Sequence, residues 1–130
     1  MKLIKSIVRP NKVDEVKDAL GKLNLGGMTV TEVRGHGKQK GHTAIYRGKE
    51  YAVNLLPKME IEVVVPDEAA DAAIKAIIGA ARTGELGDGR VFVIPLRESY
   101  KIRTGEREDE ARGIPPGDAA SLTLVGRQRQ

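Results

Sequence analysis

The sequence predicts an α+β domain whose elements follow the order β-α-β-β-α-β. Four short apolar runs with strand-like alternation are separated by two segments in which apolar residues recur at helical spacing. A chain of 130 residues is long enough for one domain with one core. A long polar segment rich in glycine, residues 35–58, separates the second run from the third, and long loops of this kind are usually functional or disordered.

The first half of the chain supplies a strand, a helix and a second strand. Residues 2–8 alternate as a strand, and Asn11 after Pro10 suits the N-cap of a helix. An apolar stripe at helical spacing is formed by Val13, Val16, Leu20 and Leu23. Residues 24–27 contain two glycines and end this helix, and residues 28–33 then alternate as the second strand.

The second half repeats this pattern after the long segment. Residues 59–65 alternate as the third strand, and Pro66-Asp67 follows as a turn with a capping residue. The buried side of the second helix is predicted to consist of Ala70, Ala73, Ile74, Ile77, Ile78 and Ala81. A glycine-punctuated turn at 83–90 leads to the fourth strand at 90–95.

This order is that of the ferredoxin-like fold, in which both helices cover one face of an antiparallel sheet. The other face stays uncovered, although the strands carry apolar residues on both sides, as Ile61 and Val63 alternate with Val64. We therefore expect self-association to cover the free face.

Composition narrows the function without fixing it. The net charge of +4 and the pI near 9.4 favour anionic partners, which could be nucleic acid, nucleotides or an acidic protein. The absence of cysteine excludes disulfides and thiolate metal sites. No apolar run approaches membrane-spanning length, and the N-terminus does not have the pattern of a signal peptide, so we expect a cytoplasmic protein.

Three clusters of glycines and cations predict a nucleotide site. In the turn 83–90, three glycines allow backbone N–H groups to approach an anion and Arg90 adds a charge, although a tight structural turn would use the same glycines. Lys101 and Arg103 alternate along an expected strand, so we expect them to point the same way, close to the glycine turn, where two cations suit a polyphosphate. A pair of solvated charges that guards a sheet edge would show the same pattern. Residues 35–40 form the third cluster.

Catalytic and RNA-binding interpretations find less support. His36 and His42 lie in a polar segment, where solvated roles are the simpler explanation, and they are too sparse for a metal site. Glu60 and Glu62 would share a strand face, but exposure explains them equally well. An RNA-recognition module needs aromatic residues on its central strands, whereas residues 59–65 contain none.

The chain after Arg112 differs in composition from the segments before it. Residues 113–130 begin with a proline- and glycine-rich stretch and end in polar residues, and only Ser121–Val125 has strand character. We therefore expect a folded domain at 1–112 and a flexible C-terminal extension at 113–130, which could also become ordered over a ligand or partner.

Several segments, in the right order, resemble the PII nitrogen-regulatory signal transduction proteins. They are GGMTVTEV at 26–33, GKQKGH at 37–42 with YRG at 46–48 and Glu50-Tyr51, ARTG at 81–84 with GDG at 87–89, and RTGE at 103–106. The resemblance covers the chain from Met1 to about Arg112 and implies a homotrimer with nucleotide sites between neighbouring subunits.

The resemblance also implies ligands and partners. ATP and ADP would compete for the cleft, and 2-oxoglutarate would bind with Mg²⁺ and ATP at the base of the long loop. The protein would be a nitrogen, carbon and energy sensor and not an enzyme. Its partners would be target proteins such as an ammonium channel, an enzyme that regulates glutamine synthetase or N-acetylglutamate kinase. It would reach a membrane only through a channel partner, and it would not bind nucleic acid.

Site residues follow from the resemblance by position. The expected nucleotide-binding residues are Ile7, Thr29, Gly35, Gly37, Lys38, Gln39, Glu62, Val64, Gly87, Asp88, Gly89, Arg90, Lys101 and Arg103. The expected 2-oxoglutarate-binding residues are Gln39, Lys40, Gly41, Lys58 and Gly87. Gln39 would also bind Mg²⁺, and Tyr51 matches a tyrosine that is nucleotidylylated in some relatives.

The sequence departs from the family pattern at three cations. Positions 38 and 101 are often arginine in the family but lysine here, whereas position 90 is often lysine but arginine here. Lysine and arginine differ at bidentate phosphate contacts, which puts the preference between ATP and ADP in doubt. Two alternatives remain, a PII-like sensor of a different small ligand and a weak ATPase.

Overall fold

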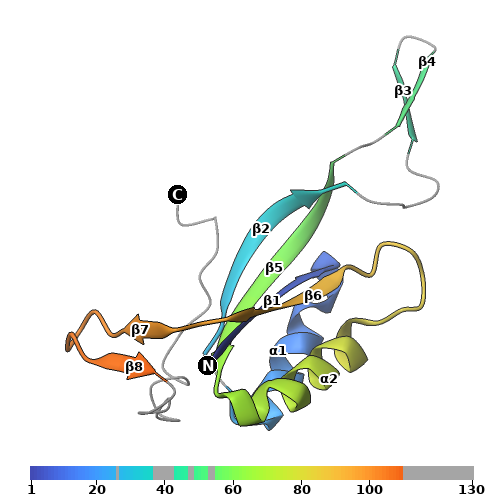
Figure 1. Cartoon of the computed structure of the whole chain (residues 1–130). Coiled ribbons are helices and arrows are strands. Elements are labelled where there is room, and N and C mark those ends of the chain that lie inside the picture. Colours follow the sequence, from blue (N-terminus) through green and yellow to red (C-terminus); the bar gives the residue numbers. More distant parts are fainter. Residues whose placement is uncertain (26, 37–42, 47–48, 53–54, 110–130) are drawn as a thin grey trace.

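The computed structural model describes residues 1–25, 27–36, 43–46, 49–52 and 55–109. Its centre is a four-stranded sheet (Figure 1) formed by β1 (Lys2–Val8), β2 (Thr29–Gly35), β5 (Leu56–Val65) and β6 (Arg90–Pro95). The strand order is β2-β5-β1-β6, and every neighbouring pair is antiparallel. Two strands, β2 and β5, are longer than predicted, and the early start of β5 places Lys58 inside a strand instead of in the preceding loop.

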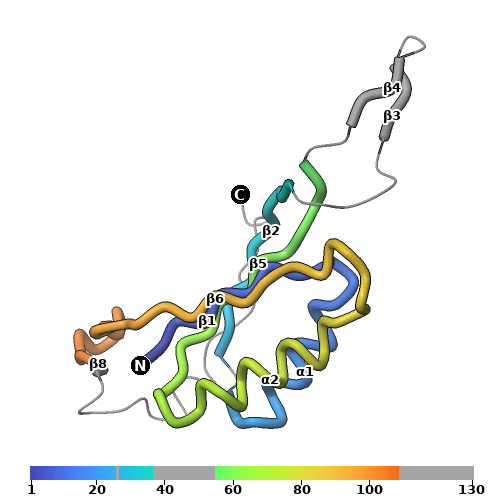
Figure 2. The backbone as a smooth tube through the Cα atoms, turned by 45° about the vertical axis from the view of Figure 1, so that its right-hand side comes forward, coloured from blue at the N-terminus to red at the C-terminus, as the bar shows by residue number. Residues whose placement is uncertain are grey.

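Two helices cover one face of this sheet and lie side by side (Figures 1 and 2). They are α1 (Val13–Lys22), preceded by the 3-10 turn Pro10–Lys12, and α2 (Ala70–Ala81), preceded by the 3-10 turn Asp67–Ala69. The predicted ferredoxin-like β-α-β-β-α-β order is therefore confirmed. The predicted N-cap is wrong, because Asn11 lies inside the 3-10 turn, and Lys12 precedes the helix without a side-chain capping hydrogen bond.

The core lies between the helices and the sheet. In β1, from Ile4 to Val8, and in β5, from Ile61 to Val65, every second residue is buried against this core and the residues between them belong to the open face of the sheet. The largest fully buried apolar side chains are Met1, Ile4, Leu20, Ile61 and Ile77. Leu23 was predicted to belong to the buried stripe but is exposed, because α1 ends at Lys22 and Asn24 then turns the chain with a φ of 59°.

The open face of the sheet and the edge strand β6 expose apolar side chains. Phe92 and Ile94 belong to the open face, and Val93, on the helix side of the same strand, is exposed by 43%. The strand β6 has a sheet neighbour on one side only, because it ends the strand order. An apolar surface of this kind is typical of an interaction site.

Two further strand pairs lie outside the main sheet. The strand β3 (Thr43–Tyr46) pairs with β4 (Lys49–Ala52), so the long segment contains a ladder of its own. The strand β7 (Glu98–Tyr100) pairs with β8 (Arg107–Asp109). The prediction that Lys101–Glu106 extend as a strand is wrong, because these residues form the turn between β7 and β8. Within the described ranges, no helix is long and apolar enough to span a membrane.

Candidate functional site

A cavity of about 750 Å³ lies where the strands β1, β2 and β5 meet the loop between α2 and β6. This loop, residues 83–89, is called the glycine loop below. The cavity is lined by Ile7, Gly35, His36, Lys58, Glu85, Leu86, Gly87, Asp88, Gly89, Arg90 and Phe92. Its volume falls within the range of small-molecule sites, which is about 300–1,000 Å³.

The glycine loop requires its glycines. Gly84, Gly87 and Gly89 have φ values of 91°, 99° and 98°, which residues with a Cβ rarely adopt. Glycine is required at position 89 for a second reason, because a Cβ there would lie 1.7 Å from the carbonyl oxygen of Ile7. The loop rejoins the sheet at this point, where Ile7 pairs with Arg90. Glycine therefore lets the loop run directly against the backbone of β1.

The carboxylate of Asp88 ties the end of the glycine loop to its beginning. It accepts hydrogen bonds from the backbone N–H groups of Thr83 and Gly84, each at 2.9 Å, and from the Thr83 hydroxyl. The Thr83 hydroxyl is the main cause that holds the pKa of Asp88 well below its usual range, while partial burial opposes this shift. Asp88 is therefore a charged acceptor that shapes the loop.

Two cations, Arg9 and Lys58, donate hydrogen bonds to the same loop. Arg9 donates from Nε to Asp88 Oδ1 at 3.1 Å and from Nη2 to the carbonyl oxygen of Leu86 at 2.8 Å. Lys58 donates from Nζ to the carbonyl oxygen of Gly87 at 2.6 Å, and its side chain is buried. Burial lowers the pKa of Lys58, nearby Arg9 lowers it further, and Asp88 raises it.

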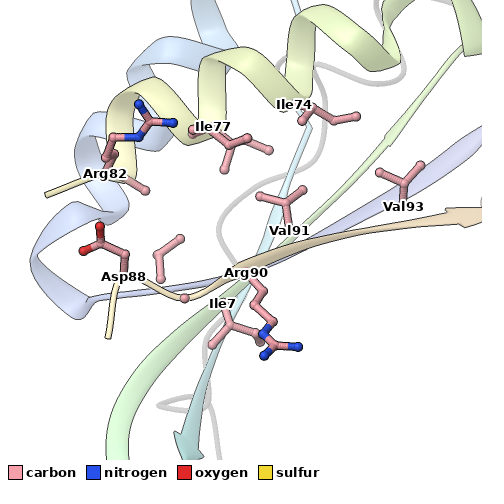
Figure 3. Close-up of a pocket in the computed structure, with 12 residues that line it drawn as sticks. Ile7, Ile74, Ile77, Arg82, Asp88, Arg90, Val91 and Val93 are labelled. Carbon is pink, nitrogen blue, oxygen red and sulfur yellow. The ribbon is translucent and has the colours of Figure 1, made fainter. Parts of the chain in front are cut away.

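A second cavity, of about 350 Å³, lies on the helix side of β6 (Figure 3). Its walls are mainly apolar and come from α2 and β6, including Ile74, Ile77, Val91 and Val93. Figure 3 shows the side chain of Arg90 on the opposite side of the strand from Val91. Ile7, Asp88, Gly89 and Arg90 line both cavities, so the end of the glycine loop forms the wall between them.

Of the twelve predicted binding residues that lie within the described part of the chain, the structure brings seven together. The first cavity is lined by seven of them, namely Ile7, Gly35, Lys58, Gly87, Asp88, Gly89 and Arg90. Three expected nucleotide-binding residues, Thr29, Glu62 and Val64, do not line it. Thr29 pairs with Glu62 further along the sheet, and Glu62 lies 3.6 Å from the Lys5 ammonium.

The predicted phosphate contacts Lys101 and Arg103 are also apart from the cavity within one chain. They lie in the turn between β7 and β8, beyond the end of β6 that is opposite the glycine loop (Figure 1). Lys101 forms an ion pair with Glu106 at 3.6 Å, whereas Arg103 is exposed. The expectation that these cations lie close to the glycine turn is therefore wrong for a single subunit.

Other predicted residues cannot be placed. Gly37, Lys38, Gln39, Lys40 and Gly41 lie outside the described residues, and of Tyr51 only the backbone, in β4, is described. The part of the chain that is described contains no cluster of three or more His, Asp or Glu side chains that could hold a metal ion. The expected Mg²⁺ ligand is Gln39, so this finding does not test it.

Sequence reasoning missed Arg9 and Thr83, which support the glycine loop. It also did not assign to the site four residues that line the cavity, namely His36, Glu85, Leu86 and Phe92. Arg9 follows β1 directly, and its contacts with the glycine loop lie 77 and 79 residues further along the chain. The spacing Thr83-Gly84 to Asp88 was the available signal for Thr83, because threonine and aspartate both bond to nearby backbone groups in turns.

Comparisons with known proteins assign this chain to a family. The family model "Nitrogen regulatory protein P-II" matches residues 1–106. A nitrogen regulatory protein P-II of Rhodobacter capsulatus is 52% identical over 111 residues, which are 85% of this chain and 99% of the relative. The relative of the same name from Rhizobium etli and the nitrogen regulatory protein P-II 1 of Escherichia coli K12 are each 51% identical, with the same coverage. The chain belongs to the P-II nitrogen regulatory protein family.

Proposed function

We propose that the protein is a homotrimeric sensor that binds ATP or ADP, binds 2-oxoglutarate together with Mg²⁺ and ATP, and regulates target proteins through the long segment between β2 and β5. It acts by binding and not by catalysis. We also propose a cytoplasmic location, with contact to a membrane only through a channel partner. The expected targets are an ammonium channel, an enzyme that regulates glutamine synthetase or N-acetylglutamate kinase.

The observation that carries this proposal is the meeting of the glycine loop, Lys58 and Arg90 at one cavity. Successive glycines with positive φ allow backbone N–H groups to approach phosphate oxygens, and Arg90 supplies a bidentate cation beside them. Lys58 is a buried cation within the same cavity and suits a carboxylate. Polyphosphate and dicarboxylate subsites would therefore be neighbours.

A trimer would bring together the predicted residues that one chain does not. Thr29, Glu62, Val64, Lys101 and Arg103 would reach the cavity from a neighbouring subunit. The exposed apolar side chains of the open sheet face and β6 provide a surface for that contact. Each nucleotide site would then be complete only in the assembled protein.

Signalling follows from differential affinity of the ligands for states of the long segment. Gly35, at the end of β2, and Lys58, near the start of β5, both line the cavity and flank that segment. A ligand that contacts both ends changes the relative free energies of the segment's conformations, and thereby the affinity for a target. Tyr51 is the candidate site for covalent modification.

Calorimetry on the full chain tests the proposal. ATP with Mg²⁺ and 2-oxoglutarate are titrated separately and then each in the presence of the other. We expect 2-oxoglutarate to tighten ATP binding and ATP to tighten 2-oxoglutarate binding by the same factor, because linkage is reciprocal. Nucleotide binding without 2-oxoglutarate binding would instead favour a sensor of another small ligand. Steady phosphate release under the same conditions would favour a weak ATPase.

A further inference from the structure

We propose that Asp88 and Arg9 are positioning residues that hold the glycine loop in its phosphate-binding shape, including when a dicarboxylate has engaged Lys58. This inference rests on the function proposed above and deepens it. Neither side chain is required to touch the nucleotide. Their role is to fix the backbone whose N–H groups bind it.

The first step is the closure of the loop. Asp88 stands near the end of the glycine loop, and its carboxylate binds the N–H groups of Thr83 and Gly84 at the beginning. These contacts make the loop a ring closed by a charged acceptor, and hydrogen bonds to charged groups are stronger than neutral ones. A loop with three positive-φ glycines has many alternative conformations when it is not closed.

The second step is the direction of the peptide groups. In a trans peptide, the carbonyl of one residue points opposite to the N–H of the next, and the described chain contains no cis peptide bond. Arg9 binds the carbonyl of Leu86, and Lys58 binds the carbonyl of Gly87. The N–H groups of Gly87 and Asp88 therefore point away from the two cations. Carbonyl oxygens, which would repel phosphate, are held by Arg9 and Lys58.

The third step is the competition for Lys58. Its ammonium donates to the neutral carbonyl of Gly87, but a ligand carboxylate is a stronger acceptor. When Lys58 turns to a dicarboxylate, Gly87 loses this support. The loop is then held by Arg9, which contacts both Leu86 and Asp88, and by the Asp88 ring. Simultaneous binding of both ligands therefore depends on these two residues.

The Asp88→Asn variant separates positioning from simple electrostatics. If Asp88 acted only through its charge, its loss would remove repulsion and tighten binding of a phosphate anion. Positioning predicts the opposite, because the amide nitrogen of asparagine cannot accept hydrogen bonds from the loop. We expect ATP affinity to fall about tenfold, the equivalent of one hydrogen bond to a charged group. Unchanged or tighter ATP binding would overturn the role of Asp88.

The Arg9→Lys variant tests the second residue. Lysine keeps the charge but does not provide the planar fork that reaches Leu86 and Asp88 together. We expect a loss of ATP affinity similar to that of Asp88→Asn, and an affinity equal to wild type would overturn the role of Arg9. Arg97→Lys, at an exposed arginine outside the loop, is the matched control and should bind ATP as wild type does.

Two readouts exclude general structural damage. Amide hydrogen exchange in both variants should accelerate in the glycine loop and remain unchanged in α1 and β5, whereas faster exchange throughout the chain would contradict positioning. In both variants, the factor by which 2-oxoglutarate increases ATP affinity should approach one. If wild type binds ATP and both variants bind it equally well, this inference fails alone. If wild type binds no nucleotide, the proposed function fails with it.

Discussion

Gly89→Ala is the substitution for which the structure gives the clearest expected cost. The added Cβ would lie 1.7 Å from the carbonyl oxygen and 2.7 Å from the carbonyl carbon of Ile7. Both atoms belong to backbone, so no side chain can rotate away. The loop must separate from β1, which disrupts the end of the β1–β6 ladder where Ile7 pairs with Arg90.

The magnitude combines two terms. A non-glycine residue at this φ of 98° costs about 1–3 kcal/mol in backbone strain. Loss of one or two ladder hydrogen bonds adds about 1 kcal/mol each. We therefore expect Gly89→Ala to lower the free energy of unfolding by about 2–5 kcal/mol, a range whose upper part is exceptional for a single substitution.

Gly84→Ala is the matched control. Its φ is 91°, close to that of Gly89, but a Cβ there meets nothing within 4 Å. It should therefore cost only the strain, about 1–3 kcal/mol. Urea unfolding followed by circular dichroism, at equal protein concentration, measures both variants. Equal losses for the two alanines would refute the argument that the approach of the loop to β1 requires glycine.

Three further predictions concern ionisation and ligands. Folding lowers the pKa of Asp88, so the ionised carboxylate stabilises the fold fully above the pKa of about 3.9 that it has in the unfolded chain. This stabilisation is lost as the pH falls towards the pKa of the folded state. Asp88→Asn should therefore reduce the loss of unfolding free energy that is measured between about pH 5 and pH 3. Burial lowers the pKa of Lys58, which means that its charge costs free energy in the folded protein at neutral pH. Lys58→Met removes this cost together with the hydrogen bond, so the unfolding free energy should change by less than about 1.5 kcal/mol. The same variant should show no 2-oxoglutarate binding in calorimetry. Gln39→Ala should abolish 2-oxoglutarate binding and preserve most ATP affinity, and unchanged 2-oxoglutarate affinity would contradict its assigned role.

Local periodicity was enough to predict the main elements of the fold. Apolar spacing over Ala70–Ala81 matches α2, and the strand at 90–95 coincides with β6. Ends were harder to predict, because capping depends on the backbone, and Lys12 precedes α1 without any capping side chain. Alternation also failed at Lys101–Glu106, where Gly105, with a φ of 74°, helps to form a turn.

From residue patterns alone, without the family resemblance, the site was predictable only where neighbours in sequence form it. The glycine loop is contiguous, so its glycines and Arg90 could be identified from the chain alone. Arg9 could not, because its role depends on contacts with residues 77 and 79 positions away. The pairing of β3 with β4 also had a sequence signal, since two four-residue runs stand two positions apart and such spacing with a glycine between the runs is typical of paired strands.

The wall that the glycine loop forms between the two cavities also matters for protein engineering. Ile74, Ile77, Val91 and Val93 contact the helix-side cavity and lie outside the lining of the larger cavity (Figure 3). Larger or smaller side chains at these positions would displace the glycine loop from its helix side, because packed interiors transmit small displacements. Libraries at these positions could therefore adjust the response range of a metabolite biosensor while every group expected to meet the ligand keeps its chemistry.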